Sequence, residues 1–211
     1  MVDPMTAPPS DPTAVIQRYL DLAHDAMRWK LRGLSEYDLR RPLTPTGTSL
    51  LGIVKHVAWV ELGYFGDVFG RPHDVALPAS TDEINADMYV RADETVDEIL
   101  ARFEAAQAHA NATLEALPLD AEGHVPWWGE NNPVTLQLIA LHLVTEIHRH
   151  LGQMDILREG LDGAVGHRDG VDNLPPVDPA FWPAHVAALE DIARETTGHT
   201  PDGPATSAGK A

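Results

Sequence analysis

The sequence predicts an all-α fold, a bundle of four long helices with one shorter helix after them. Apolar residues recur at intervals of three and four along four long segments, and no segment shows a convincing strand-like alternation. Residues 70–93, between the second and third long segments, form a long polar connection, so at least one link is expected to cross over the bundle. With 44% apolar residues in 211, the chain can bury the core of a single domain.

The first long helix is expected over residues 13–34. Asp11 is a suitable N-cap, and Pro12 fits the first helical position, where its missing N–H costs nothing. A Ser35-x-x-Asp38 pattern then predicts one short turn of helix before a proline-containing connector.

The second and third long helices carry their own start signals. The second covers residues 50–69 and begins after Thr48 or Ser49. The third covers residues 95–117 and opens with a T-x-x-E capping box, in which threonine and glutamate each satisfy an N–H of the first turn.

The fourth long helix is expected to start at Pro133 with Asn132 as its cap, and to continue to about Arg158 before Gly160. A shorter fifth helix is expected over residues 180–195.

The ends of the chain differ in composition from the middle. Residues 1–12 and 198–211 are rich in Pro, Gly, Ser, Thr and Ala and are predicted to be disordered. Residues 13–197 form the predicted helical domain, with a C-terminal extension from about residue 160.

Composition excludes several classes of function. The 32 acidic and 15 basic residues give a net charge of −17, which repels phosphate backbones and anionic lipid, so neither nucleic acid nor membrane is an expected partner. Without a signal peptide or a membrane-spanning run, a cytoplasmic location is expected. Cysteine is absent, so any sulfur chemistry must use sulfur that a substrate brings.

The stretch VTEIHRHLGQMDILRE places polar residues on an otherwise apolar stripe. The a/d seam of this helix consists of Leu136, Ile139, Leu143, Glu146, His150, Gln153 and Leu157. A carboxylate in a bundle core costs several kcal/mol unless it is paired or bound to a metal. Glu146 and His150 therefore need an inward partner.

The second long helix offers such a partner in His56, which shares a face with Ile53 and Val60. Imidazole and carboxylate ligands suit Zn²⁺ or another divalent transition metal, and three protein ligands leave a position open for water or substrate. The alternative is a hydrogen-bonded network of the same groups with Arg149 or Tyr64 that binds no ion.

The remaining histidines are weaker candidates. His142 lies two turns, about 12 Å, before His150, so the two cannot share an ion; it fits a pocket wall or the edge of the core equally well. His148 faces away from the seam and is expected to be solvated. The same is expected of His24, His109, His167, His185 and His199.

Three motifs, LLGIVKHVAWVE, VPWW and HLVTEIHRHLGQMDILRE, resemble the DinB/YfiT-like metalloprotein superfamily. The similarity covers residues 13–160 and is greatest to the branch of mycothiol-dependent maleylpyruvate isomerase and mycothiol S-transferases. It implies a DinB-like four-helix bundle with a crossover connection, and the metal ligands His56, Glu146 and His150. Gln153 stands where this branch often has a second histidine.

The resemblance implies a zinc-dependent thiol S-transferase that joins mycothiol, a low-molecular-weight thiol, to electrophiles in detoxification. No catalytic residue is predicted beyond the metal centre. The protein is expected to act on small molecules as a monomer or homodimer. Predicted substrate contacts are Trp59, Trp127, Trp128, Asn131, His142 and Gln153, although the tryptophans fit a plug at the end of the core equally well.

Three other functions fit the same residues. A mycothiol-dependent isomerase of the maleylpyruvate type would use the same ion and thiol without consuming the thiol. A hydrolase would use metal-bound water, although no separate general base is evident. A non-catalytic protein would use the site to bind a metal or ligand only.

Overall fold

The computed structural model describes residues 9–75, 83–129 and 132–197. Most of the two predicted disordered ends, together with Asn131 and His199, lies outside these ranges. The chain divides into two compact units, Met1–Asn173 and Leu174–Ala211. Within the described ranges, no helix is both long and apolar enough to cross a bilayer.

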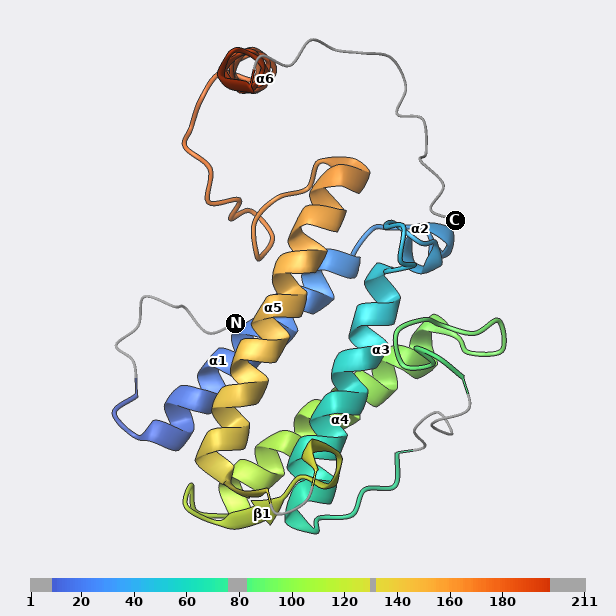
Figure 1. Cartoon of the computed structure of the whole chain (residues 1–211), viewed down its shortest axis with the longest axis vertical. Coiled ribbons are helices and arrows are strands. Elements are labelled where there is room, and N and C mark those ends of the chain that lie inside the picture. The colour runs from blue at the N-terminus through green and yellow to red at the C-terminus, as the bar shows by residue number, and fades with distance from the viewer. Residues whose placement is uncertain (1–8, 76–82, 130–131, 198–211) are drawn as a thin grey trace. The chain divides into compact units, whose positions relative to one another are not determined.

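The first unit is a bundle of four long helices, and the second contains one helix (Figure 1). The all-α class is therefore confirmed. In chain order the elements are α1 Pro12–Leu31, α2 Glu36–Arg40, α3 Leu50–Glu61, the π-helical turn η1 Leu62–Gly66, the 3₁₀ turn η2 Asp67–Phe69, α4 Val96–Ala116, β1 Glu122–His124, the 3₁₀ turn η3 Pro126–Trp128, β2 Pro133–Thr135, α5 Leu136–Asp162 and α6 Phe181–Thr197.

The first helices begin where their capping residues predict. The Asp11 carboxylate accepts from the Ala14 N–H at the start of α1, and Ser35 and Ser49 cap α2 and α3 in the same way. At α4 both halves of the Thr95 capping box are present. Each cap satisfies an N–H that has no partner within its own helix.

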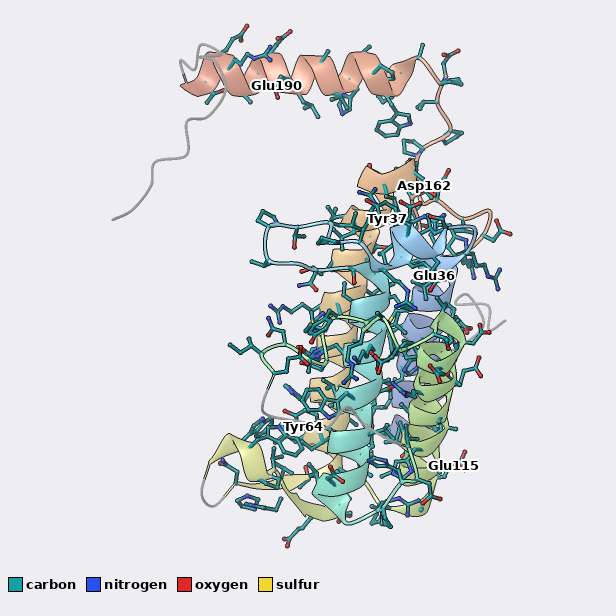
Figure 2. The ribbon with its side chains drawn as sticks, turned by 90° about the vertical axis from the view of Figure 1, so that its right-hand side faces the viewer. Glu36, Tyr37, Tyr64, Glu115, Asp162 and Glu190 are labelled. Carbon is teal, nitrogen blue, oxygen red and sulfur yellow. The ribbon has the colours of Figure 1, made fainter. Side chains whose placement is uncertain are left out.

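The bundle has a crossover connection. Figure 1 shows α3 and α4 running in one direction and α1 and α5 in the other. In Figure 2, Tyr64 and Glu115 lie at one end, and Glu36, just before α3, lies at the opposite end. Since α3 and α4 are parallel, the chain between them must return along the length of the bundle.

The start and end of α5 differ from the sequence prediction. Pro133–Thr135 is a strand paired with Glu122–His124, and the helix starts at Leu136 with Thr135 as its cap. Burial of Val134 and pairing with β1 favour the extended form over a helical turn. The helix passes Gly160 and ends at Asp162; its C-cap is Gly163, whose φ of 77° is left-handed, a conformation that favours glycine.

The apolar core lies between the four long helices. Met27 of α1, Ile53 of α3, Phe103 of α4, and Ile139 and Met154 of α5 are completely buried. These large side chains fill the space between the helices, among them α3 and α5, which carry His56, Glu146 and His150.

Two histidines predicted to be solvated are not. His24 is 1% exposed and pairs with buried Glu61 at 2.9 Å, because it lies on the α1 stripe between Leu20 and Met27. The Nε2 atom of His109 is shielded from solvent beside the His73 ring. The helix phase in each case turns the imidazole toward the protein.

Candidate metal centre and its pocket

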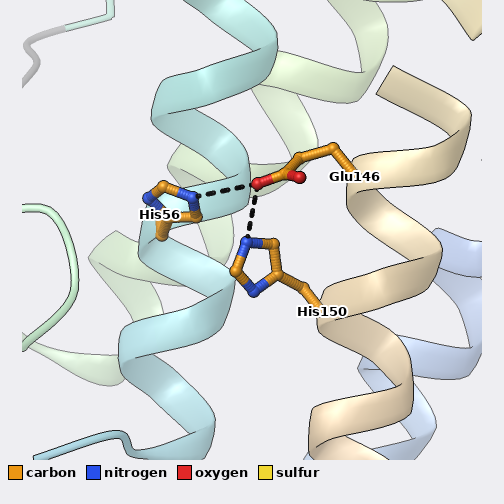
Figure 3. Close-up of side chains that lie close together, drawn as sticks. All are labelled: His56, Glu146 and His150. Atoms are coloured by element: carbon orange, nitrogen blue, oxygen red, sulfur yellow. Dashed lines mark hydrogen bonds and ion pairs between the residues drawn. The ribbon is translucent and has the colours of Figure 1, made fainter. Parts of the chain in front are cut away.

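Three side chains from α3 and α5 converge in the bundle (Figure 3). Nε2 of His150 lies 3.0 Å from Oε1 of Glu146, and Nε2 of His56 lies 3.9 Å from the same oxygen. One donor atom from each residue lies within 4.8 Å of the other two. The structure thus brings together the three residues that the sequence analysis proposed as ligands.

The phase of each helix explains this convergence. His56 comes three residues after Ile53 on α3; Glu146 and His150 each come three residues after a buried residue of α5, Leu143 and Ile147. All three side chains therefore point from the core stripe toward the facing helix. They remain partly accessible, with exposed fractions of 17% for His56, 25% for Glu146 and 7% for His150.

Each imidazole has a hydrogen-bond partner on its other nitrogen. Oδ2 of Asp87 lies 2.6 Å from Nδ1 of His56, and Oε1 of Gln153 lies 2.8 Å from Nδ1 of His150. Both oxygens accept, so both Nδ1 atoms carry the proton. If both rings are neutral, each Nε2 directs a lone pair toward the Glu146 carboxylate, and a cation between the three groups would satisfy all of them. If His150 is protonated, its Nε2–H donates to Glu146 directly.

The geometry fits a divalent ion. Tetrahedral Zn²⁺ with nitrogen and oxygen ligands at about 2.0–2.2 Å has neighbouring donors about 3.4 Å apart. The two separations at Glu146, 3.0 and 3.9 Å, bracket that value. Hydrogen-bonded outer partners such as Asp87 and Gln153 are typical of metal-binding histidines, because they orient the ring and fix its tautomer.

Asp87 reaches His56 because its segment packs tightly on α3. A side chain at Gly52 would overlap the carbonyl oxygen of Met88, so glycine permits this approach. Lys55 of α3 adds two polar contacts: its Nζ donates to the carbonyl of Tyr89 at 2.9 Å and pairs with Glu94 at 2.7 Å. Met88 and Tyr89 are thereby held over α3 next to Asp87.

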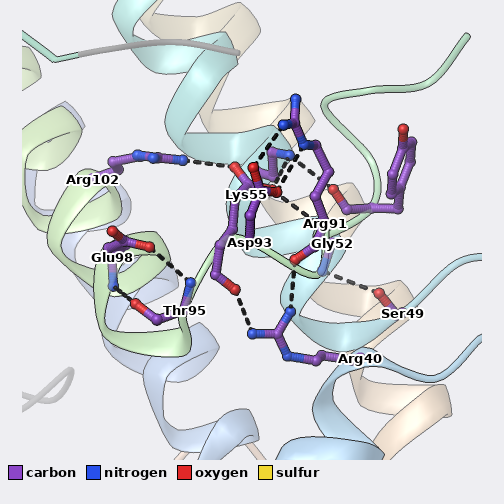
Figure 4. A network of polar contacts seen from close by, with 11 residues as sticks. Arg40, Ser49, Gly52, Lys55, Arg91, Asp93, Thr95, Glu98 and Arg102 are labelled. Carbon is purple, nitrogen blue, oxygen red and sulfur yellow. Dashed lines mark hydrogen bonds and ion pairs between the residues drawn. The ribbon is translucent and has the colours of Figure 1, made fainter. Parts of the chain in front are cut away.

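The Glu94 carboxylate accepts hydrogen bonds from Lys55, the Arg91 N–H and Arg102, three of the residues labelled in the polar network of Figure 4. Arg40 donates to the carbonyls of residues 91 and 94. Burial opposes ionisation of Glu94, but the hydrogen bonds to its carboxylate outweigh it and lower the pKa of the carboxyl. The network anchors the segment that presents Asp87.

A cavity of about 730 Å³ opens beside the three residues. His56 and Glu146 form part of its wall, so an ion held there would be reached from the cavity. The other lining residues are Trp59, Val60, Gly63, Tyr64, Asp67, Trp127 and His142. The volume is within the range of small-molecule sites.

The π-helical turn η1 lies at this cavity. It carries Gly63 and Tyr64, and the Trp127 ring packs beside Gly63. The indole N–H groups of Trp127 and Trp128 both donate to the Tyr64 hydroxyl, at 3.1 and 2.8 Å. Such π-helical turns occur often at functional sites.

The remaining predicted contact residues fall into three groups. Trp59, Trp127 and His142 line the cavity. Trp128 is not among the lining residues but supports the wall through Tyr64, and Gln153 contacts His150 instead of the cavity. Asn131 lies outside the described residues. His148 is exposed, as predicted.

Sequence reasoning missed two acidic residues near the site. Asp87 lies in the irregular connection before α4, where no periodicity indicates which side chain faces inward. Asp67, at the start of η2, lines the cavity after the helix changes its hydrogen-bonding pattern, so α-helical spacing does not place it. The only signal in the sequence was the acidic residue type itself.

Fold and site together define a class: a four-helix bundle with a candidate His–Glu–His metal centre beside an aromatic pocket. Within this class, the family model described as mycothiol-S-transferase matches residues 15–163. The chain therefore belongs to the mycothiol-S-transferase family, in the DinB/YfiT-like superfamily. Searches of curated proteins and of solved structures gave no match.

Proposed function

We infer that the protein is a zinc-dependent S-transferase that conjugates mycothiol to electrophiles. The observation that carries this proposal is that two of the three candidate ligands, His56 and Glu146, form part of the wall of the cavity. A structural metal site would be closed, whereas a catalytic one keeps an open position. Membership of the mycothiol-S-transferase family supports the same reaction type.

His56, Glu146 and His150 would hold the ion. When bound, it would supply Lewis acidity, which keeps an incoming thiol deprotonated at neutral pH, where a free thiol with a pKa near 8.5 is mostly protonated. This division of roles suits a chain without cysteine, because the reacting sulfur belongs to the co-substrate.

The protein's own residues position the reactants. Trp59, Val60 and Trp127 give the cavity flat apolar surfaces, which suit a sugar ring and exclude water from the reacting atoms. Asp87 and Gln153 hold the two imidazoles so that each Nε2 faces Glu146. No rearrangement of these side chains is then needed when the thiol arrives.

The first test is elemental analysis of the purified protein, followed by a thiol-consumption assay with mycothiol and a reactive electrophile. We expect one divalent ion per chain and a thioether product. Conversion of the substrate to an isomer at a constant thiol concentration would indicate isomerisation. Turnover without any thiol would indicate hydrolysis. A tightly held metal without turnover across an electrophile panel would indicate a binding protein.

Cobalt substitution tests how the thiol is activated. Mycothiol added to the cobalt protein should produce a sulfur-to-metal charge-transfer band and release about one proton. An analogue with a hydroxyl in place of the thiol is the matched control and should produce neither. A spectrum unchanged by saturating mycothiol, in protein shown to hold cobalt, would reject the proposal.

A further inference from the structure

Among the described residues, those that line the cavity include acidic groups but no lysine or arginine. Glu146 and Asp67 contribute carboxylates, and the Asp67 side chain is 58% exposed at the rim. Nε2 of His73 lies 4.0 Å from the Asp67 carboxylate, and no lysine or arginine of the described residues forms an ion pair with Asp67. Arg149, which lies 3.8 Å from the Glu146 carboxylate, is 69% exposed. It does not line the cavity.

A simple charge count extends this observation. A divalent ion would be neutralised by the Glu146 carboxylate and by one thiolate, if both imidazoles are neutral. Asp67 in the lining and Asp87 behind His56 would then be uncompensated, in a chain of net charge −17. A second substrate that enters this cavity meets a negative field, which disfavours organic anions.

In the part of the chain that the structure describes, the Tyr64 hydroxyl accepts two hydrogen bonds but donates none. Its oxygen accepts from the indoles of Trp127 and Trp128, which are donors only. Its own proton therefore cannot be shared with either indole. Within the described ranges, no protein group accepts from this hydroxyl. Tyr64 lines the cavity, so a ligand is the natural acceptor.

We propose that the second substrate is an uncharged or cationic α,β-unsaturated carbonyl compound whose carbonyl oxygen accepts the Tyr64 proton. The proposal rests on the thiol-transfer function inferred above. It adds a substrate class and two residue roles. Asp67 selects against anions, and Tyr64 contacts the reacting group.

The reaction is a conjugate addition and needs no further reagent. The thiolate sulfur forms a bond to the β-carbon, and the π-electron pair moves through the α-carbon onto the carbonyl oxygen. Tyr64 stabilises the charge that develops on this oxygen by donating its hydrogen bond. The proton that the thiol gave up returns to the α-carbon through solvent. The product is a single thioether that contains all the atoms of the thiol and of the carbonyl compound.

The substrate class is tested with three acrylamides that differ only in a remote group. N-(3,3-dimethylbutyl)acrylamide is neutral, the 2-trimethylammonioethyl compound is its cationic isostere, and the 2-carboxyethyl compound is anionic. Each kcat/KM is divided by the uncatalysed rate with mycothiol. We expect the anionic compound to be poorer by about tenfold or more. Equal or better use of the anion would overturn the proposal.

Variants at Asp67 test the cause of this preference. Asp67→Asn should reduce the discrimination against the anionic acrylamide, and Asp67→Lys should reverse it, because the rim charge changes sign. A ratio of anionic to cationic kcat/KM that stays the same in both variants would show that Asp67 does not select the substrate.

Tyr64→Phe tests the hydrogen bond. It should lower kcat/KM for the neutral acrylamide by about a hundredfold, the usual effect of losing one donor to a developing oxyanion. An alkyl iodide of matched size has no carbonyl, so its rate should change by less than about threefold. Equal losses with both electrophiles would mean that the hydroxyl only supports the wall, and would overturn its assigned role.

Equilibrium binding separates this proposal from the transfer function. The saturated propionamide analogues cannot react, and their binding to the metal-loaded protein is followed by quenching of tryptophan fluorescence. Tighter binding of the neutral and cationic analogues without thiol consumption in any assay would support the charge preference and overturn the transfer function. Thiol consumption with tighter binding of the anionic analogue would overturn only the present proposal.

Discussion

The Asp87 carboxylate lies 2.6 Å from Nδ1 of His56 and fixes the proton on that nitrogen, so that Nε2 faces Glu146. A carboxylate behind a metal-binding histidine raises the basicity of the ring and holds its orientation. The orientation depends in turn on the packing of the neighbouring Met88 against Gly52. One residue outside the predicted ligand set therefore determines how His56 is presented.

Replacing Asp87 should weaken the metal site without removing it. We expect Asp87→Ala to lower the affinity for Zn²⁺ by about 10- to 100-fold, measured by competition with a chelating dye. Asp93→Ala is the control, because Asp93 belongs to the same segment but pairs with Arg91 at the surface, away from His56. Wild-type affinity in the Asp87 variant would show that this contact does not support the site.

Alanine variants of the three proposed ligands should lose the metal, whereas a variant of a neighbouring histidine on α5 should keep it. His150→Ala and Glu146→Ala should each abolish stoichiometric binding of the ion, as should His56→Ala on α3. His148→Ala should retain full metal content, because its side chain is exposed and its Nδ1 contacts the Val144 carbonyl of its own helix. Elemental analysis of the four variants checks this. Full occupancy in all three ligand variants would refute the assignment.

The sequence alone could predict most of the bundle because helix signals are local. Caps at Asp11, Ser49 and Thr95 set three of the four starts, and the three-four spacing turned His56, Glu146 and His150 inward. These features depend on residues within one or two turns of each other.

The errors arose where long-range contacts decide the conformation. Asn132 and Pro133 look like a helix start, but pairing with β1 holds Pro133 in a strand. His24 lies on the apolar stripe of α1, but the carboxylate that pairs with it there, Glu61, is 37 residues away; the position of Asp87 likewise depends on the approach of its segment to α3. Spacing along one helix carries no information about such partners.

Gly52 and Gly160 should respond oppositely to alanine. At Gly52 a Cβ atom would overlap the Met88 carbonyl, so Gly52→Ala should destabilise metal-free protein by about 1–3 kcal/mol and weaken Zn²⁺ binding. At Gly160 nothing lies within 4 Å of the Cβ position, so Gly160→Ala should stabilise by about 0.4–1 kcal/mol. Urea denaturation measures both. A neutral Gly52→Ala would mean that the segment carrying Asp87 is not held by this packing.

His109 should make the fold sensitive to mild acid. Burial is the main cause that lowers the pKa of its imidazole, and the charges of the neighbouring His73 and Arg71 lower it further. A hydrogen bond with the Arg71 backbone and the Asp67 carboxylate oppose this with smaller effects. The neutral ring is thus favoured in the folded protein, whereas in the unfolded chain it titrates near its ordinary value of about 6.5.

The sign of this effect follows from proton binding. Above about pH 6.5 the ring is neutral in both states and contributes no pH dependence. As the pH falls below that value, the unfolded chain binds the proton first, so the free energy of unfolding decreases until the folded-state pKa is also passed. His109→Gln removes this group. The free energy of unfolding of the variant should therefore fall less than that of the wild type when the pH is lowered from 7 to 5. Urea denaturation of both metal-free proteins at each pH measures the difference, in which the titration of all other groups cancels. Parallel losses of stability would show that His109 binds its proton equally well in the folded and unfolded states.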